Sequence, residues 1–262
     1  MITPIASADK SSQALPPAYK IMSISQIEDG VYLIQGKTSC RKTVQNNRNM
    51  VILRRHVMGN QYELTLINPI RMEEDDVEEL NKLGKIYSLI RLGSTIGECE
   101  DQYYLNKYPN TIRLAPGNAS YKSKLPIHHL LTDHSFLLDE RSQVFIFKGT
   151  KHPEAALLLR RPSGNILVTS ESLQSDQPSQ RMSYFTKKSK IKSDMAPMVI
   201  PTRWLKKMST EQGSLREEFK RLSNLDFSRQ VGASGKWVHS HAKESTVLAV
   251  NKTFRQAKNE RR

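Results

Sequence analysis

The stretch NMVILRRHVMGNQYELTLINPIRMEEDDVEELNKLGKIYSLIRLG, residues 49–93, carries the clearest structural pattern of this 262-residue chain. Its first half contains two runs rich in β-branched and aromatic residues, NMVILRR (49–55) and YELTLINP (62–69). The segment MGNQY (58–62) between them holds a Gly-Asn turn signal. Two strand-like runs joined by such a turn predict a β-hairpin.

The second half of this stretch begins with a helical pattern over residues 72–85. Val77, Leu80 and Leu83 recur at helical spacing and form an apolar stripe. Acidic residues fill the first turns, where they suit the positive end of the helix dipole, and Gly84 follows the last apolar position. We therefore expect a helix that packs its stripe on the neighbouring strands.

The segments after this helix alternate between strand and helix. IYSLIRLG (86–93) is an apolar run of strand length, typical of a strand buried on both faces. A short helix is expected around 101–108, and TIRLAP (111–116) has the pattern of another strand. This order is the alternation expected of α/β architecture.

Further strands and two helices complete the expected fold. We predict strands at VYLIQG (31–36), VFIFKG (144–149), AALLLRR (155–161) and NILVTS (165–170), and helices over 214–225 and 242–258. Residues 1–24 are expected to form a loose arm and residues 25–259 a single domain. A basic loop is expected near residues 181–197.

The charge of the chain is uneven. Forty Lys and Arg against 26 Asp and Glu give a net charge of +14, and residues 181–262 hold +12 of it. The run KKSKIK (187–192) is the densest part of this excess. Such a segment attracts anionic partners such as nucleic acid, although a solvated surface is the simpler interpretation.

Other sequence features bear on where in the cell the protein is expected. No apolar run approaches the length of about 18 residues that a membrane span needs. The first 17 residues lack the basic and apolar regions of a secretory signal, and the chain holds two cysteines. We therefore expect a cytoplasmic protein without a disulfide framework.

The order of these segments resembles the metallo-β-lactamase fold over about residues 25–255. IEDGVYLIQG resembles the first strand of that family, the 49–93 stretch resembles the region leading to its metal-binding loop, and PEAALLLRRPSGNILVTSESLQ resembles its later hairpin. LSNLDFSRQVGASGKWVHSHAKE is similar to its closing segment. The resemblance implies an α/β protein, a four-layer αββα sandwich with a metal site on loops at one edge. Typical active members hydrolyse esters, thioesters, lactams or phosphodiesters with one or two zinc or iron ions.

The resemblance also assigns the family's metal-ligand positions to residues of this chain. Ile96 stands in place of a histidine beside Gly97, and Ser234 takes the place of the final histidine. Neither side chain substitutes for a neutral imidazole as a ligand. The positions of this vestigial site are Ile96, Glu100, Asp101, His152, Glu171 and Ser234.

Four of these positions keep a side chain that can bind metal. Glu100 and Asp101 match an acidic pair of the family if one residue is inserted before them. His152 lies near the place of the next ligand histidine, and Glu171 replaces an aspartate that bridges two metals. A loop histidine beside a proline is more often an ordinary surface residue than a metal ligand.

These positions predict a metallo-β-lactamase-fold protein that has lost its catalytic metal site and acts as a non-catalytic or binding protein, with no cofactor. One alternative is a divergent metal-dependent hydrolase that holds one zinc or iron ion with Glu100, Asp101, His152 and Glu171. Another is a nucleic-acid-binding protein that uses the basic C-terminal third. The anionic partner would then contact Lys187, Lys188, Lys190 and Lys192.

Overall fold

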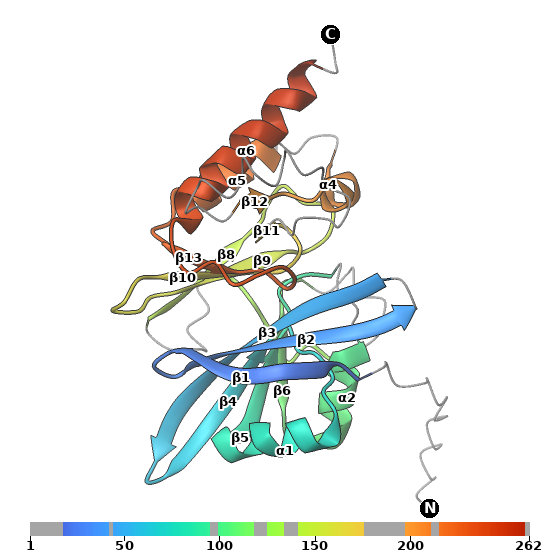
Figure 1. The fold of residues 1–262 in the computed structure, drawn as a ribbon, viewed down its shortest axis with the longest axis vertical. Helices are drawn as coiled ribbons and strands as arrows, with labels where there is room; N and C mark the ends of the chain where they lie inside the picture. Colours follow the sequence, from blue (N-terminus) through green and yellow to red (C-terminus); the bar gives the residue numbers. More distant parts are fainter. Residues whose placement is uncertain are drawn as a thin grey trace, which may run out of the picture.

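The structure is a computed structural model that describes residues 18–41, 44–94, 99–117, 125–133, 141–175, 197–210 and 215–259. Within these ranges, strands form two main sheets and helices cover their outer faces (Figure 1). The larger sheet has the order β1-β2-β3-β4-β5-β6-β7, and the smaller sheet has the order β13-β10-β9-β8. The strands β11 and β12 pair separately.

The larger sheet begins antiparallel and becomes parallel from β4 onward. The β3–β4 hairpin expected from the sequence is confirmed, with the turn at Gly59 in the left-handed region (φ 57°). Its strands are β1 (Lys20–Glu28), β2 (Val31–Arg41), β3 (Val44–Met58), β4 (Gln61–Ile67), β5 (Lys85–Ile90), β6 (Ile112–Ala115) and β7 (His129–Leu130).

The outer face of the larger sheet is covered by two helices, α1 (Glu74–Leu83) and α2 (Cys99–Lys107). Both match helices expected from the sequence. Val77 and Leu80 of α1 are fully buried against the sheet, as the apolar stripe predicts. Gly84 ends α1 where a side chain would not fit, because a Cβ there would lie 2.6 Å from the Tyr62 carbonyl oxygen.

The smaller sheet consists of β8 (Ser142–Ile146), β9 (Ala155–Leu159), β10 (Ile166–Thr169) and β13 (Arg229–Val231). Every residue of β9 and β10 is buried, because apolar layers lie on both of their faces. The outer layer contains β11 (Gln174–Ser175), β12 (Met198–Val199), α4 (Thr202–Met208), α5 (Leu215–Ser223) and α6 (Ala242–Asn259). The helices expected near the C-terminus are therefore present as α5 and α6.

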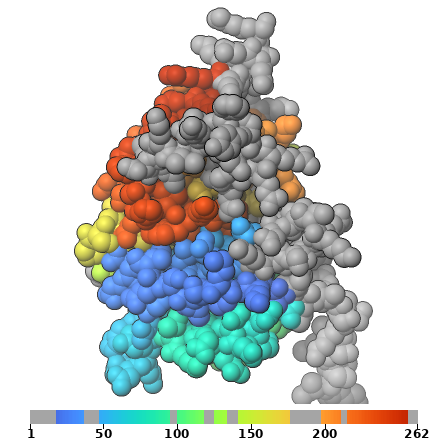
Figure 2. Space-filling view, viewed as in Figure 1, coloured from blue at the N-terminus to red at the C-terminus, as the bar shows by residue number. Residues whose placement is uncertain are grey.

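Three apolar clusters fill the spaces between successive layers. One lies between α1, α2 and the larger sheet, the second between the two sheets, and the third between the smaller sheet and α4, α5 and α6. The four layers are thus helix, sheet, sheet and helix, which agrees with the fold class expected from the sequence. On the surface, β1 and β2 form a blue band between α1 and the C-terminal helices (Figure 2).

Residues 20–24, placed in a loose arm by the sequence, form the first part of β1, an edge strand whose largely polar pattern gives a weak strand signal. The basic run 187–192 lies outside the described residues. None of the described helices is both long enough and apolar enough to cross a membrane.

Candidate functional site

The candidate site lies where the parallel strands β4 and β5 end and approach the start of β9. Gly93 forms an isolated antiparallel bridge with Glu154, and the Ala155 amide donates to the Leu92 carbonyl at 2.7 Å. These contacts join the edges of the two sheets. Open α/β sheets bind ligands beyond the carboxyl ends of parallel strands, so this edge is the expected place for a site. We call it the strand-end site, defined by Gly93, Glu100, Asp101, Glu154 and Glu171.

Asn68 fixes the geometry of this edge. Its backbone adopts a left-handed conformation (φ 52°), which asparagine tolerates better than most residues. Its side-chain amide donates to the Thr169 carbonyl at 3.1 Å, and its side-chain oxygen accepts from the Leu92 amide at 3.3 Å. One buried side chain therefore links the ends of β4, β5 and β10.

Glu154 occupies the interior of the strand-end site. A Cβ added to Gly93 would overlap the Glu154 carboxyl group and would lie 2.7 Å from Ser170 Oγ. Glycine at position 93 therefore makes room for the glutamate. Sequence reasoning did not select Glu154, although a glutamate directly before the apolar run 155–159 was a signal for a buried acid.

The protonation of Glu154 is set mainly by its burial. The side chain is fully buried, and burial raises the pKa of this carboxyl group from 4.5 to about 8. Interactions with Ser172 and Trp204 lower the pKa, and the negative charge of Glu171 raises it. Glu154 is therefore mostly protonated near neutral pH.

Asp101 is held in a buried ion-pair network. The Arg91 Nε donates to both carboxylate oxygens at 3.1 and 3.2 Å, and the Arg113 Nε donates to Oδ2 at 2.8 Å. All three side chains are fully buried. Arg91 and Arg113 therefore bind both carboxylate oxygens of Asp101. The sequence resemblance had assigned Asp101 to the vestigial metal site.

Glu100 and Glu171 lie within electrostatic range of a further arginine. Burial lowers the pKa of the Arg48 guanidinium, and the Arg91 charge lowers it further, whereas Glu100 and Glu171 raise it. Glu100 itself is buried at the start of α2. Glu100 and Glu171 thus both lie near the positive charge of Arg48.

His152 lies in a positively charged environment. Its pKa is lowered by burial first and then by the charges of Lys207 and Lys151. Two nearby ammonium groups that disfavour a proton on this imidazole also disfavour a metal cation at the same nitrogen.

Asn49 positions the loop that carries Ser234. Its side-chain amide donates to the carbonyl oxygens of Gly232 at 2.9 Å and Gly235 at 3.0 Å, and its backbone amide donates to the Ala233 carbonyl at 2.9 Å. These bonds hold the closing loop of the chain against β3. Ser234, which lies between these bonded residues, lines a cavity.

That cavity, which we call the cationic cavity, has a volume of about 250 Å³. It brings together Glu171 and Ser234, two of the positions that the sequence assigned to the vestigial site. It is lined by Glu171, Gln174, Pro201, Arg203, Trp204, Lys207 and Ser234. Sequence reasoning missed the three residues from α4, Arg203, Trp204 and Lys207.

The other assigned positions are not gathered into one set of ligands. Asp101 is engaged by arginines, His152 lies beside lysines, and Ile96 lies outside the described residues. Within the described part of the chain, no group of three His, Cys, Asp or Glu side chains could hold a metal ion. Asp101 and His152 therefore both lie near positive charges, which disfavour a cation.

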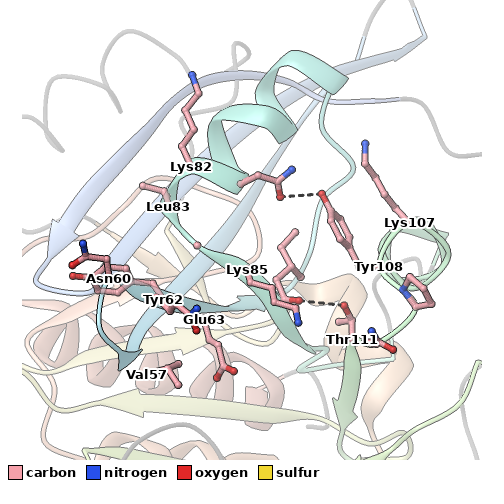
Figure 3. Close-up of a pocket in the computed structure, with 16 residues that line it drawn as sticks. Val57, Asn60, Tyr62, Glu63, Lys82, Leu83, Lys85, Lys107, Tyr108 and Thr111 are labelled. Carbon is pink, nitrogen blue, oxygen red and sulfur yellow. Dashed lines mark hydrogen bonds between the residues drawn. The ribbon is translucent and has the colours of Figure 1, made fainter.

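A second and larger cavity, which we call the far cavity, lies where β4, β5 and β6 begin. This is the end of these strands opposite to the strand-end site. Its volume is about 820 Å³, and Figure 3 shows residues that line it. The Tyr108 hydroxyl donates to Asn81 Oδ1 at 3.0 Å, and the Thr111 hydroxyl donates to the Ile86 carbonyl at 3.5 Å. Lys82 and Lys107 on its rim form ion pairs with acidic residues of α1. Two of the three lysines that line the far cavity are therefore paired with acids.

Comparison with known proteins gives a clear result for the fold. No model of a known protein family matches the chain, and no characterised protein matches its sequence. Among solved structures it is similar to the metallo-β-lactamase FIM-1 from Pseudomonas aeruginosa in its mono-zinc form, with a TM-score of 0.60 and 12% identity over 92% of this chain and 99% of that one. A metallo-β-lactamase from Erythrobacter litoralis matches with a TM-score of 0.57 and 10% identity over 89% and 96% of the two chains.

A metallo-β-lactamase from Hirschia baltica matches with a TM-score of 0.57 and 11% identity over 88% of this chain and 98% of that one. These similarities span nearly the whole of each neighbour. The chain has the metallo-β-lactamase fold, as the sequence resemblance predicts. Identities of 10–12% show the fold and not the activity.

Proposed function

We propose that this metallo-β-lactamase-fold protein has lost its catalytic metal site and acts by binding. The observation that carries the proposal is the capture of Asp101 by Arg91 and Arg113 in the buried network. A carboxylate that binds metal must be ionised and must offer a free lone pair to the ion. Replacing this double ion pair by a metal bond would remove the negative charge of Asp101 from two buried guanidinium groups, at a cost of several kcal/mol.

Two further donors, Glu154 and His152, are unsuited for separate reasons. Glu154 keeps its proton near neutral pH because burial raises its pKa to about 8. His152 lies in the field of Lys151 and Lys207. A metal in this fold supplies an activated water and a Lewis acid for hydrolysis. Without it, the chain retains a cavity that can recognise a ligand.

Elemental analysis of the purified protein tests the proposal. We expect zinc and iron well below one equivalent after dialysis, and no gain of esterase, thioesterase or phosphodiesterase activity when either metal is added. Stoichiometric metal that survives dialysis would contradict the proposal.

The rival hydrolase, with Glu100, Asp101, His152 and Glu171 around one ion, has its own test. It requires that His152→Ala and Glu171→Ala both abolish retained metal and activity. Lys206→Gln is a matched control because Lys206 is an exposed residue of α4 that does not line the cationic cavity.

A further inference from the structure

The cationic cavity has the charge of an anion site. Arg203 and Lys207 line it together with a single carboxylate, Glu171. Lys151 adds to the positive charge nearby, because it acts together with Lys207 on His152. Among the described side chains, neither Arg203 nor Lys207 forms an ion pair.

The two cations occupy one face of a short helix. Arg203 and Lys207 lie four residues apart on α4, and α4 has no acidic residue. Like charges at this spacing repel each other on the surface of a helix. A bound anion would relieve that repulsion, whereas a helix with only a structural role gains nothing from the arrangement.

Packing fixes the position of the helix that carries these cations. Trp204, between them in sequence, is 2% exposed, and its ring centroid lies 5.9 Å from that of Phe147 and 5.6 Å from that of Phe219. Met208 at the end of α4 is also buried. The aromatic contacts hold α4 against the smaller sheet, near β11 and β12 (Figure 1), so the cavity wall is pre-formed.

The neutral groups of the cavity complete a site for an oxyanion. Ser234 contributes a hydroxyl group, held in place by the Asn49 contacts, and Gln174 contributes a side-chain amide. Arginine binds oxyanions through two parallel N–H groups, and lysine adds a compact positive charge. The volume of about 250 Å³ limits the ligand to a small molecule.

We infer that the cationic cavity binds a small oxyanion, the phosphate or carboxylate group of a small molecule, between Arg203 and Lys207. Glu171 on the cavity wall repels a simple anion and accepts a hydrogen bond from a hydroxyl or amino group of the natural ligand. This inference deepens the proposed binding function and rests on it.

The test is a titration of the full chain with inorganic phosphate and, separately, with succinate, followed by the two tryptophan indole N–H signals in NMR spectra. We expect saturable shifts of the Trp204 signal, with Trp237 as an internal reference because it does not line the cavity. The anion that binds more tightly identifies the phosphoryl or carboxylate class. Absence of saturable shifts with both anions would overturn the inference.

Matched variants locate the binding. Arg203→Gln combined with Lys207→Gln should weaken binding by roughly tenfold or more, since two charge-assisted contacts are removed. Glu171→Gln should strengthen phosphate binding several-fold, and Lys206→Gln should leave it unchanged. Unchanged affinity in the double variant would refute the site, provided that its melting temperature matches the wild type.

Metal analysis of the same samples separates this inference from the proposed function. Stoichiometric metal together with Arg203-dependent anion binding would contradict the proposed function and support the anion site. Metal-free protein without saturable anion binding would contradict the anion site alone.

Discussion

The two ends of the parallel strands β4, β5 and β6 differ in how far their ion pairs are exposed to solvent. Where β4 begins, near the far cavity, the Arg55–Glu63 pair joins two partly exposed side chains. Where β5 and β6 end, Arg91, Asp101 and Arg113 pair with no exposure to solvent. Both ends hold ion pairs, but only the second end removes them from water.

The difference indicates at which end of the sheet the charges are not explained by their contribution to stability. Exposed ion pairs contribute about 0–1 kcal/mol and cost little to lose. Buried ion pairs are often no better than well-packed apolar residues, although breaking one is expensive. Stability alone therefore gives no reason for the buried charges, whereas a polar site at that edge does.

The largest expected effect comes from breaking the buried network. Asp101→Asn should lower the free energy of unfolding by about 3–5 kcal/mol, because Arg91 and Arg113 lose their shared counter-charge in the interior. Urea denaturation at pH 7 measures the change. Glu63→Gln at the other end is the control and should cost no more than about 1 kcal/mol. Equal losses of unfolding free energy for the two variants would contradict the proposed difference between the two ends of the strands.

The next largest effect concerns the pH dependence of stability. Unfolded Glu154 loses its proton near pH 4.5, whereas folded Glu154 keeps it to about pH 8. The folded state therefore binds more protons between these values, and the free energy of unfolding falls as the pH rises from about 4.5 to 8.

Glu154→Gln removes this titration while keeping the shape of the side chain. At pH 8 the variant should be more stable than the wild type by a few kcal/mol, at about 1.4 kcal/mol per unit of pKa shift. At pH 4 the two proteins should have similar stability. Parallel stability curves from pH 4 to 8 would show that Glu154 does not titrate as its burial requires.

A smaller effect is expected from filling the space beside Glu154. Gly93→Ala should cost about 1–3 kcal/mol, because the new methyl group overlaps a buried carboxyl group that cannot swing into solvent. In a Glu154→Ala background the same change should cost less. A double-mutant cycle in urea measures this coupling, and additive costs would argue against the close approach.

The smallest effect on stability is expected for the basic run. Changing Lys187, Lys188, Lys190 and Lys192 to Gln should leave the urea midpoint unchanged, since an exposed loop is expected there. If these lysines contact nucleic acid, the change should reduce both affinity and the slope of its salt dependence. Unaltered binding curves would identify the run as a solvated surface.

Much of the fold follows from sequence periodicity. The Gly-Asn turn predicts the β3–β4 hairpin, and the stripe of Val77, Leu80 and Leu83 predicts α1, because both patterns are local. Local patterns fail for β1, whose edge position leaves many of its residues exposed, and for α4, whose seven residues bury only Trp204 and Met208.

The strand-end site was harder to predict because its residues come from separate segments of the sequence and lie together only in the folded chain. The resemblance predicts that Ile96 and Ser234 stand where the family has ligand histidines, but it does not reveal what the neighbouring acids contact. Arg91 and Arg113 within apolar strand patterns were the available signal, since a charge in a buried strand requires a buried partner. The sequence gives no indication that this partner is Asp101.

The contacts of Asn49 have a consequence for the order of folding. Its bonds to Gly232 and Gly235 join residues 183 and 186 positions apart in the chain. Contacts of such long range form slowly, because a large loop must close before they can stabilise anything. During synthesis on the ribosome, the cavity wall that carries Ser234 cannot assemble until Gly235 has emerged. Ligand binding at that wall would therefore require that the chain from Asn49 to Gly235 has been synthesised and has folded.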